Sequence, residues 1–251
     1  EGRFRMGDIL GKSGIEKRWD SDLRGIDGAR YVEVDARGRE IATGKDLVLG
    51  GFSDSLDYVP GHNMILTIDK DIQQAAFDSF KSHNRIGSAV VMDPRNGEIL
   101  ALVNAPSFDP NHFSTGIPPE IWSLLINDPF KPLRNKAIQD HFPPASTFKA
   151  LIALAAIQEK IITPETKINC KGKLRFGKRD YNCWIRHGHG PVNVFEALQK
   201  SCDVFFYTMG MQLGIDKIAK YARKIGYGVR TVILLDNERS GLIPDSEWKK
   251  K

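Results

Sequence analysis

The tetrapeptide Ser146-Thr147-Phe148-Lys149 has the residue types and the spacing that covalent acyl chemistry requires. Pro143-Pro144 should end any preceding helix, and the apolar run 150–157 predicts a helix that starts at this point. The serine then lies in the first helical turn, with the lysine one turn later on the same face. A lysine kept partly neutral by burial can take the serine proton, and the helix N-terminus favours a developing oxyanion. The competing interpretation is a capping serine followed by a solvated lysine, so the pattern needs support from the rest of the chain.

The composition is that of a globular protein with a mild positive charge. The 251 residues carry a net charge of +5 with a pI near 9.0, and lysines and arginines are scattered between acids. Lys249-Lys250-Lys251 is too short for a nucleic-acid-binding tail, so no nucleic acid partner is expected, whereas an anionic polymer or membrane surface is compatible. No stretch has the length of a membrane span or the form of a signal peptide. Since the chain starts at Glu1 and has no closing element after Trp248, we expect a segment of a larger protein.

Residues 1–60 are glycine-rich and charged, with little apolar content. Their pattern predicts a short helix near 15–19 and a strand at 31–35, which a turn at 36–39 reverses. We expect an extended accessory module without an independent core.

From residue 61 the apolar pattern becomes that of a packed domain. It predicts a strand at 64–68, a helix at 72–81 with Asp69 as its N-cap, and a hairpin of strands 88–93 and 98–103 around Asn96-Gly97. A loop-rich segment is expected at 163–192, followed by amphipathic helices at 194–213 and 215–225. A hairpin, a helix that carries the nucleophile and further helices together predict an α+β fold.

Two motifs resemble the active-site boxes of class B penicillin-binding proteins. Residues 142–149 resemble the first box, with Ala145 where the family usually has glycine. Ser201-Cys202-Asp203 resembles the second box, S-x-N, with aspartate in place of asparagine, as in the elongation-type branch, penicillin-binding protein 2. S-x-[ND] also occurs at Ser82 and Ser107, but Ser201 follows the nucleophile and lies inside a predicted helical run. Further collinear matches extend the resemblance over nearly the whole chain, at 11–16, 32–39, 66–69, 188–190 and 239–244.

The family's third box, K-[ST]-G, has no match after the nucleophile. Lys12-Ser13-Gly14 has the right letters but precedes Ser146, so we interpret it as the turn into a helix. The resemblance implies a penicillin-binding transpeptidase fold, related to serine β-lactamases, incomplete at its C-terminus and preceded by an extended β-rich pedestal. The expected domains are a pedestal or dimerisation-like module at 1–60 and the N-terminal part of the transpeptidase domain at 61–251. Without the third box, which would supply an oxyanion-hole amide, we expect the segment alone not to turn over.

The resemblance implies acyl transfer between peptidoglycan stem peptides during cell elongation. Ser146 would attack the D-Ala-D-Ala bond, with Lys149 as its general base and the Ser146 N–H as one oxyanion donor. Ser201 would relay a proton between Lys149 and the leaving amine, and Asp203 would orient the substrate or the lysine by hydrogen bonding. β-Lactam antibiotics would acylate the same serine because they mimic the substrate amide.

All three cysteines fall between residues 170 and 202, and with one histidine they would make a Cys₃His set typical of structural zinc: Cys170, Cys183, His189 and Cys202. The spacing is irregular, so the clustering in a poorly apolar segment is the main support. Elongation-type relatives carry Cys, Asp or His at similar places, and some bind zinc there. Three alternatives stay open: a Cys170–Cys183 disulfide, three buried thiols, or His187 in place of His189. His189 is preferred because it lies in the Gly-His-Gly of the family match.

Two other functions compete with a transpeptidase. A serine β-lactamase or β-lactam sensor shares S-x-x-K and S-x-N, although the collinear accessory module argues against it. A scaffold role is the third hypothesis, in which residues 1–60 would contact a rod-shape scaffold protein and a SEDS-type glycosyltransferase by resemblance. The resemblance also implies a location on the periplasmic side of the cytoplasmic (inner) membrane, with an N-terminal anchoring helix outside this segment.

Overall fold

A computed structural model describes residues 9–30, 32, 34–39, 55–114 and 116–250. The chain divides into two compact units, Glu1–Gln139 with Ile233–Glu238, and Asp140–Val232 with Arg239–Lys251. Each unit combines helices and strands, so the predicted α+β class is confirmed. In the described part of the chain, no helix combines the length and the apolarity needed to cross a bilayer.

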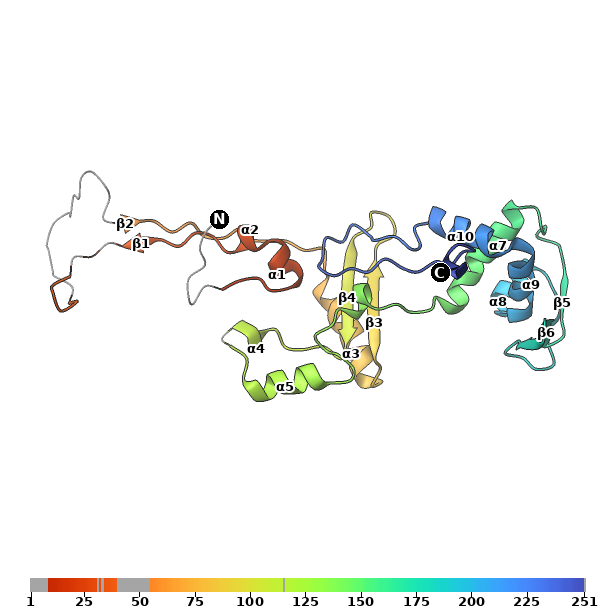
Figure 1. The fold of residues 1–251 in the computed structure, drawn as a ribbon, viewed down its shortest axis with the longest axis horizontal. Coiled ribbons are helices and arrows are strands. Elements are labelled where there is room, and N and C mark those ends of the chain that lie inside the picture. Colours follow the sequence, from red (N-terminus) through yellow and green to blue (C-terminus); the bar gives the residue numbers. More distant parts are fainter. Residues whose placement is uncertain (1–8, 31, 33, 40–54, 115, 251) are drawn as a thin grey trace. The chain divides into compact units, whose positions relative to one another are not determined.

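The first unit begins with two short helices and a narrow two-stranded ladder. These elements are α1 (Gly14–Arg18), α2 (Asp20–Leu23), β1 (Ala29–Arg30) and β2 (Ser55–Leu56) (Figure 1). The helix expected near 15–19 is confirmed, with Ser13 as its N-cap, which agrees with the interpretation of Lys12-Ser13-Gly14 as a helix start. Of the strand expected at 31–35, Tyr31 and Glu33 lie outside the described residues. The turn after it is present, because Asp35 N–H donates to Arg39 O at 2.9 Å.

Close backbone approach explains part of the glycine content of this module. A Cβ on Gly61 would lie 1.9 Å from Leu23 O, and one on Gly25 would lie 2.4 Å from Val59 O. Neither position can carry a side chain without moving the paired segment.

A helix and a hairpin form the packed part of the first unit. They are α3 (Lys70–Ser82), β3 (Gly87–Met92) and β4 (Ile99–Ala105), with β3 antiparallel to β4 (Figure 1). Asp69 caps α3 as predicted, since its carboxylate accepts from the N–H groups of Asp71 and Ile72. The side-chain amide of Gln73 bonds both the N–H and the C=O of Leu102, which fixes α3 against β4.

The strand predicted at 64–68 is wrong. Two hydrogen bonds join this part of the chain to β4: Thr67 Oγ1 donates to Ile99 O at 2.7 Å, and the adjacent Asp69 N–H donates to Leu100 O at 2.9 Å. The apolar alternation is present in the sequence, yet Ile65 is 96% exposed, so no ladder forms. Three short helices follow in a proline-bearing stretch: α4 (Asn111–Ser114), α5 (Pro119–Asn127) and α6 (Lys136–Gln139).

The second unit packs four helices against four short strands. The helices are α7 (Phe148–Gln158), α8 (Val194–Gln199), α9 (Asp203–Leu213) and α10 (Ile215–Lys224). The strands are β5 (Ile168–Cys170), β6 (Lys173–Phe176), β7 (Arg179–Asn182) and β8 (Gly190–Val192). Fully buried Phe205 and Met209 of α9 lie in one core cluster with the alanines of α7, and these small side chains allow the helices to approach closely.

Two expectations for this unit need refinement. The segment 163–192 is rich in loops, as predicted, but it also contains four short strands, because β5 pairs with β8 and β6 pairs with β7. The helix expected at 194–213 is two helices, since α8 ends at Gln199 and α9 begins at Asp203. The break at 200–202 contains Ser201 and Cys202 of the second candidate box, and Asp203 begins α9.

Candidate active site

Ser146 lies in a short 3₁₀ turn (Ala145–Thr147) that leads into α7, as the prolines before it predicted. The Ser146 side chain is exposed, and Thr147 Oγ1 donates to Pro144 O, which closes the turn. The N–H of Ser146 donates to no acceptor within the described residues. A free N–H at the start of a helix, next to a reactive hydroxyl, is the arrangement that an oxyanion donor needs.

Ala145 adopts a left-handed backbone conformation, with φ of 51°. This conformation costs an L-residue about 1 kcal/mol relative to glycine. The glycine that the family usually has at this position is therefore the residue that the local geometry favours. The chain keeps a strained alanine directly before its candidate nucleophile.

Ser201 follows the end of α8 and is not inside a helix. The prediction that it lies within a helical run is therefore wrong. Its N–H donates to Leu198 O at 3.1 Å, and Cys202 N–H donates to Ala197 O at 2.8 Å. These two bonds form a Schellman motif, in which the residue after the cap is left-handed and is usually glycine. Ser201 occupies that position with φ of 49°. The chain reversal turns its side chain toward α7.

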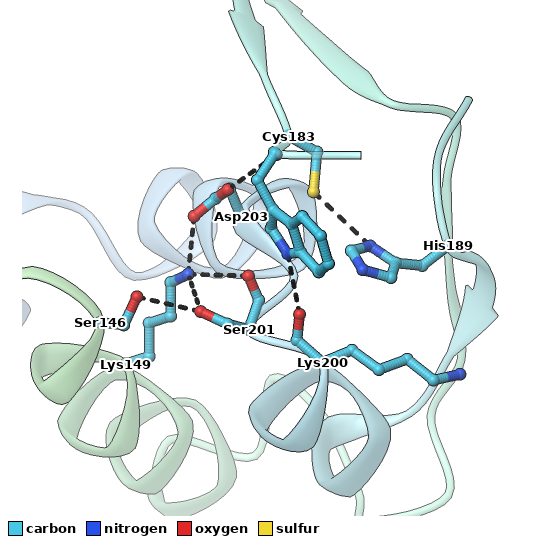
Figure 2. Close-up of polar contacts among 8 residues, drawn as sticks. Ser146, Lys149, Cys183, His189, Lys200, Ser201 and Asp203 are labelled. Carbon is cyan, nitrogen blue, oxygen red and sulfur yellow. Dashed lines mark hydrogen bonds and ion pairs between the residues drawn. The ribbon is translucent and has the colours of Figure 1, made fainter. Parts of the chain in front are cut away.

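A network of hydrogen bonds brings the two candidate boxes together (Figure 2). Ser201 Oγ lies 2.9 Å from Ser146 Oγ and accepts from Lys149 Nζ at 2.9 Å. Lys149 Nζ also donates to Ser201 O at 3.0 Å and to Asp203 Oδ1 at 2.6 Å. The four predicted residues are therefore in one cluster, although they come from positions more than fifty residues apart along the chain.

All three ammonium protons of Lys149 have an acceptor in this cluster. The lysine is largely buried, with 13% of its side chain exposed, and the ring of Phe206 lies 5.8 Å from Nζ. The two residues of the first box, Ser146 and Lys149, share no direct hydrogen bond among the described contacts. Ser201 Oγ stands between them, so a proton moving from Ser146 to the lysine would pass through the second serine.

The structure adds one residue that sequence reasoning missed, Trp184. Its backbone N–H donates to Asp203 Oδ2 at 3.2 Å, and its indole N–H donates to Lys200 O at 2.9 Å. The first bond fixes the carboxylate that contacts Lys149, and the second fixes the peptide group before Ser201. No motif marks this tryptophan, and its position beside Cys183 is the only sequence signal that could have drawn attention to it.

The predicted metal-binding residues also converge. The ligand atoms of Cys170, Cys183, His189 and Cys202 all lie within 4.8 Å of one another, and the cysteines are free and buried. Cys183 Sγ is 3.5 Å from His189 Nδ1, close to the edge of about 3.6 Å that tetrahedral zinc bond lengths imply. His187 is exposed and is not part of the group.

The protonation of these thiols differs with their surroundings. Burial raises the pKa of Cys202 to about 12. Burial also raises the pKa of Cys170, but hydrogen bonds from the backbone of His189 and Gly172 and from the thiols of Cys202 and Cys183 together outweigh it, so this pKa is lowered. Nε2 of His189 is buried without a hydrogen-bond partner. Three buried sulfurs and one imidazole nitrogen within 4.8 Å of one another are a donor set that fits a tetrahedral metal ion.

A second S-x-x-K occurs at Ser246–Lys249. The N–H of Ser246 donates to Asp216 Oδ1 at 2.8 Å, and Lys249 is exposed in a final 3₁₀ turn (Trp248–Lys250). This pair has no buried base, so the spacing by itself does not define the site.

The fold and the site define a class of protein that comparison with known proteins identifies. Residues 87–251 match the penicillin binding protein transpeptidase domain, and residues 1–49 match the penicillin-binding protein dimerisation domain. The chain belongs to the penicillin-binding protein transpeptidase family. The fold is accordingly a part of the penicillin-binding transpeptidase fold.

Among individual proteins, the chain is similar to peptidoglycan D,D-transpeptidases named MrdA. It is 40% identical to the Escherichia coli K12 protein over 244 residues, which is 96% of this chain and 37% of that protein. The Acinetobacter baumannii protein is 36% identical over 97% of this chain and 35% of its own length. The chain thus spans just over a third of the length of these relatives.

Solved structures of PBP2 proteins have the same fold. A complex of PBP2 with MreC from Helicobacter pylori matches with a TM-score of 0.79 and 33% identity, covering 96% of this chain and 43% of that one. Pseudomonas aeruginosa PBP2 in complex with WCK 5153 matches with a TM-score of 0.77 and 30% identity, covering 96% of this chain and 48% of that one.

Proposed function

We propose that this chain carries the acylation centre of a serine-type peptidoglycan D,D-transpeptidase that cross-links stem peptides during cell elongation. The observation that carries the proposal is the position of Ser201 Oγ, 2.9 Å from both Ser146 Oγ and Lys149 Nζ. The relatives named peptidoglycan D,D-transpeptidase support the reaction class. In this proposal Ser146 is the nucleophile, Ser201 relays its proton, the charge of Lys149 supports that relay, and Asp203 holds the lysine.

In the first step, Ser146 Oγ forms an ester bond to the carbonyl carbon of the penultimate D-alanine. The amide C–N bond breaks and the terminal D-alanine leaves as an amine. The Ser146 proton passes to Ser201 Oγ, and the Ser201 proton passes to the leaving nitrogen, so the step is balanced. The positive charge of Lys149 stabilises the oxygen of Ser201 while this exchange occurs.

In the second step, an amine of a neighbouring stem peptide attacks the ester carbonyl. A new amide bond forms, the ester bond breaks, and the amine proton returns through Ser201 to Ser146. The free N–H of Ser146 is one oxyanion donor for both steps. By family resemblance a K-[ST]-G strand supplies a second donor, and this chain has no such motif after Ser146.

The decisive experiment is covalent labelling of the full-length protein. A fluorescent penicillin should form one stable adduct, and peptide mass spectrometry should place it on Ser146. Ser146→Ala should abolish labelling, whereas Lys149→Gln should reduce it by about 10²–10³-fold, the usual contribution of a positioned electrostatic donor. An adduct on another residue, or normal labelling of the Ser146→Ala protein, would rule out this site.

The same experiment separates the competing enzyme class. A transpeptidase keeps the penicilloyl ester for many minutes, whereas a serine β-lactamase hydrolyses it and regenerates the free enzyme. Rapid loss of the adduct with continuous penicillin hydrolysis would favour the β-lactamase. A sensor domain would keep the adduct but would not cross-link stem peptides.

We further propose that Cys170, Cys183, His189 and Cys202 bind a structural Zn²⁺. Three thiolates and one imidazole nitrogen are a donor set that zinc prefers, and four protein ligands leave no open position for catalysis. The close packing of the three sulfurs and the approach of His189 Nδ1 to Cys183 Sγ support the proposal. The disulfide alternative would join two of the sulfurs and leave the third free.

The wider setting of the protein is also a proposal. One PBP2 of known structure is a complex with MreC, which supports a rod-shape scaffold protein as a partner of residues 1–60 here. A chain with the same fold occurs in a solved peptidoglycan synthase complex that coordinates polymerization and crosslinking. This supports a polymerising partner here, which the family resemblance gives as a glycosyltransferase of the SEDS type. β-Lactams are expected to inhibit the protein.

Stem peptides lie outside the cytoplasm, so the catalytic part should face the periplasm and be anchored in the inner membrane. A pull-down with residues 1–60 tests the scaffold contact.

A further inference from the structure

A concentration of positive charge lies on the β6–β7 hairpin and its flanks, and neither the acylation centre nor the cysteine cluster uses it. The segment 171–187 contains six lysines and arginines and one aspartate, a net charge of +5. The whole chain has the same net charge, so the remaining residues sum to zero. The excess positive charge of the chain is thus concentrated in this hairpin and its two flanks.

The hairpin directs most of these charges away from the protein. β6 pairs with β7 through a tight turn at Gly177, where φ is 57°. Asp180 is occupied inside the hairpin, since it accepts from Lys173 at 2.9 Å and from Arg175 at 3.0 Å. The other cations are exposed and have no carboxylate partner among the described residues: Lys171, Lys178, Arg179 and Arg186.

The hairpin is attached directly to the candidate active site. Tyr181 of β7 packs edge-on against Tyr207 of α9, with ring centroids 5.7 Å apart. β7 continues through Cys183 into Trp184, whose N–H donates to Asp203. The hairpin packs against α9, the helix that begins just after Ser201 (Figure 1). The hairpin and the second box are therefore parts of one continuous packed segment.

We propose that this hairpin, residues 171–187, is a docking surface for the carboxylate-bearing peptides of uncross-linked peptidoglycan. The inference rests on the proposed function. A glycan strand with free stem peptides repeats negative carboxylates along its length, which is the complement of an exposed cluster of lysines and arginines. Exposed Phe176 and Trp184 add apolar surface for the same polymer. An anionic bilayer also attracts such a surface, but the direct link to α9 favours a ligand whose other end is the acyl donor.

The distance between the hairpin turn and the candidate active site shows which part of the polymer each would bind. Six residues separate Lys178 at the turn from Trp184, and at about 3.3 Å per residue this is roughly 20 Å. One extended five-residue stem peptide spans at most about 18 Å. The hairpin turn therefore contacts neighbouring stem peptides of the same strand, and a single stem peptide in the active site does not reach it.

The test uses three forms of the full-length protein. The hairpin variant is Lys178→Gln with Arg179→Gln, and the matched control is Lys220→Gln with Lys224→Gln, two exposed lysines of α10. We expect the hairpin variant to bind purified glycan strands with stem peptides about tenfold more weakly, with a smaller salt dependence. Its binding to a single stem peptide and its rate of penicillin acylation should equal those of the unmodified protein and the control.

Three results would overturn the proposal. The first is equal binding of glycan strands by the hairpin variant and the unmodified protein. The second is an equal loss in the control, which would mean a general charge effect. The third is lost binding to phosphatidylglycerol vesicles with unchanged binding to glycan strands, which would make the hairpin a membrane contact. Failure of the proposed function looks different, because the unmodified protein would then not be acylated while its polymer binding would still be measurable.

Discussion

Ser201 is held in an unusual backbone conformation from both sides. Trp184 donates its indole N–H to the carbonyl before Ser201, and Lys149 donates to the carbonyl of Ser201 itself. With both neighbouring peptide groups fixed, the left-handed φ of 49° is maintained and Oγ stays between the nucleophile and the lysine. Strain of this kind costs of order 1 kcal/mol and persists where the surroundings determine the conformation.

The Schellman position separates the conformational role of Ser201 from its chemical role. Ser201→Gly should raise the stability of the protein by about 0.5–1 kcal/mol, because glycine adopts the left-handed conformation without strain. The same change should slow penicillin acylation by about 10²-fold or more, because the proton relay is lost. Denaturant unfolding and acylation kinetics measure the two effects. Ser201→Ala is the control, and it should be slow to acylate without being more stable. A fast-acylating glycine variant would contradict the relay.

Trp184 should act as a positioning residue for the second box. Trp184→Phe keeps an aromatic ring but removes the indole N–H, and loss of one hydrogen bond of about 1 kcal/mol should slow acylation roughly fivefold. Trp122→Phe is the matched control, because that exposed tryptophan lies in the other unit. Penicillin binding before acylation should be unchanged, so the effect should fall on the first-order acylation rate. An unchanged rate in Trp184→Phe would show that the indole bond has no role.

At the residue scale, the spacing and the apolar helix after it made Ser146 and Lys149 candidates, but Ser246–Lys249 has the same spacing, so the family resemblance was needed to choose between them. Ser201 and Asp203 needed the family resemblance, since S-x-[ND] occurs elsewhere in the chain and the true setting is a helix end. Trp184 could not be predicted, because its role depends on a loop that folds back to residue 200.

At the scale of elements, local capping signals predicted α3 and the β3–β4 hairpin correctly. The break between α8 and α9 escaped notice because residues 200–202 contain neither glycine nor proline, the usual signals of a helix end. The strands at 168–192 are three or four residues long, which is too short for alternation to be recognised.

One contact between elements predicts an acid-sensitive part of the stability. Glu159, just after α7, accepts from Lys217 at 2.7 Å and from Tyr221 Oη at 3.0 Å, both on α10. The hydrogen bond from Lys217, followed by that from Tyr221, lowers the pKa of Glu159 below its ordinary value of 4.5. A carboxyl whose pKa is lower in the folded than in the unfolded state stabilises the protein fully at pH values above the unfolded-state pKa. This contribution is lost as the pH falls through the folded-state pKa.

We expect the stability of the Glu159→Gln protein to depend less steeply on pH in the acid range. Denaturation midpoints should fall less steeply below about pH 4.5 than in the unmodified protein, and the difference should shrink as the pH drops further. Glu165→Gln is the control, because that carboxylate makes no ion pair among the described residues. Parallel acid limbs in all three proteins would mean that the contact does not contribute to stability.

At the scale of the whole molecule, the two candidate centres share the segment 183–203. Cys202 lies between Ser201 and Asp203, and Cys183 precedes Trp184. A metal bound by the cysteines would therefore hold two segments in place: the end of the strand before Trp184, and the start of the helix that carries Asp203. The clustering of cysteines was visible in the sequence, but their convergence to within 4.8 Å required the pairing of β5 with β8 and of β6 with β7.

Removal of the metal should consequently affect stability and chemistry together. We expect one zinc per chain in the purified full-length protein, and chelation should lower the melting temperature by roughly 10 °C. Acylation of Ser146 should slow at the same time, because the loop that positions Asp203 loses its ligand, and added Zn²⁺ should restore both properties. Cys170→Ser, a change in β5 away from the second box, should reproduce the loss, whereas His187→Ala should not. If metal analysis finds no zinc and thiol titration finds three free cysteines, the site is wrong, and one free cysteine would instead indicate the disulfide.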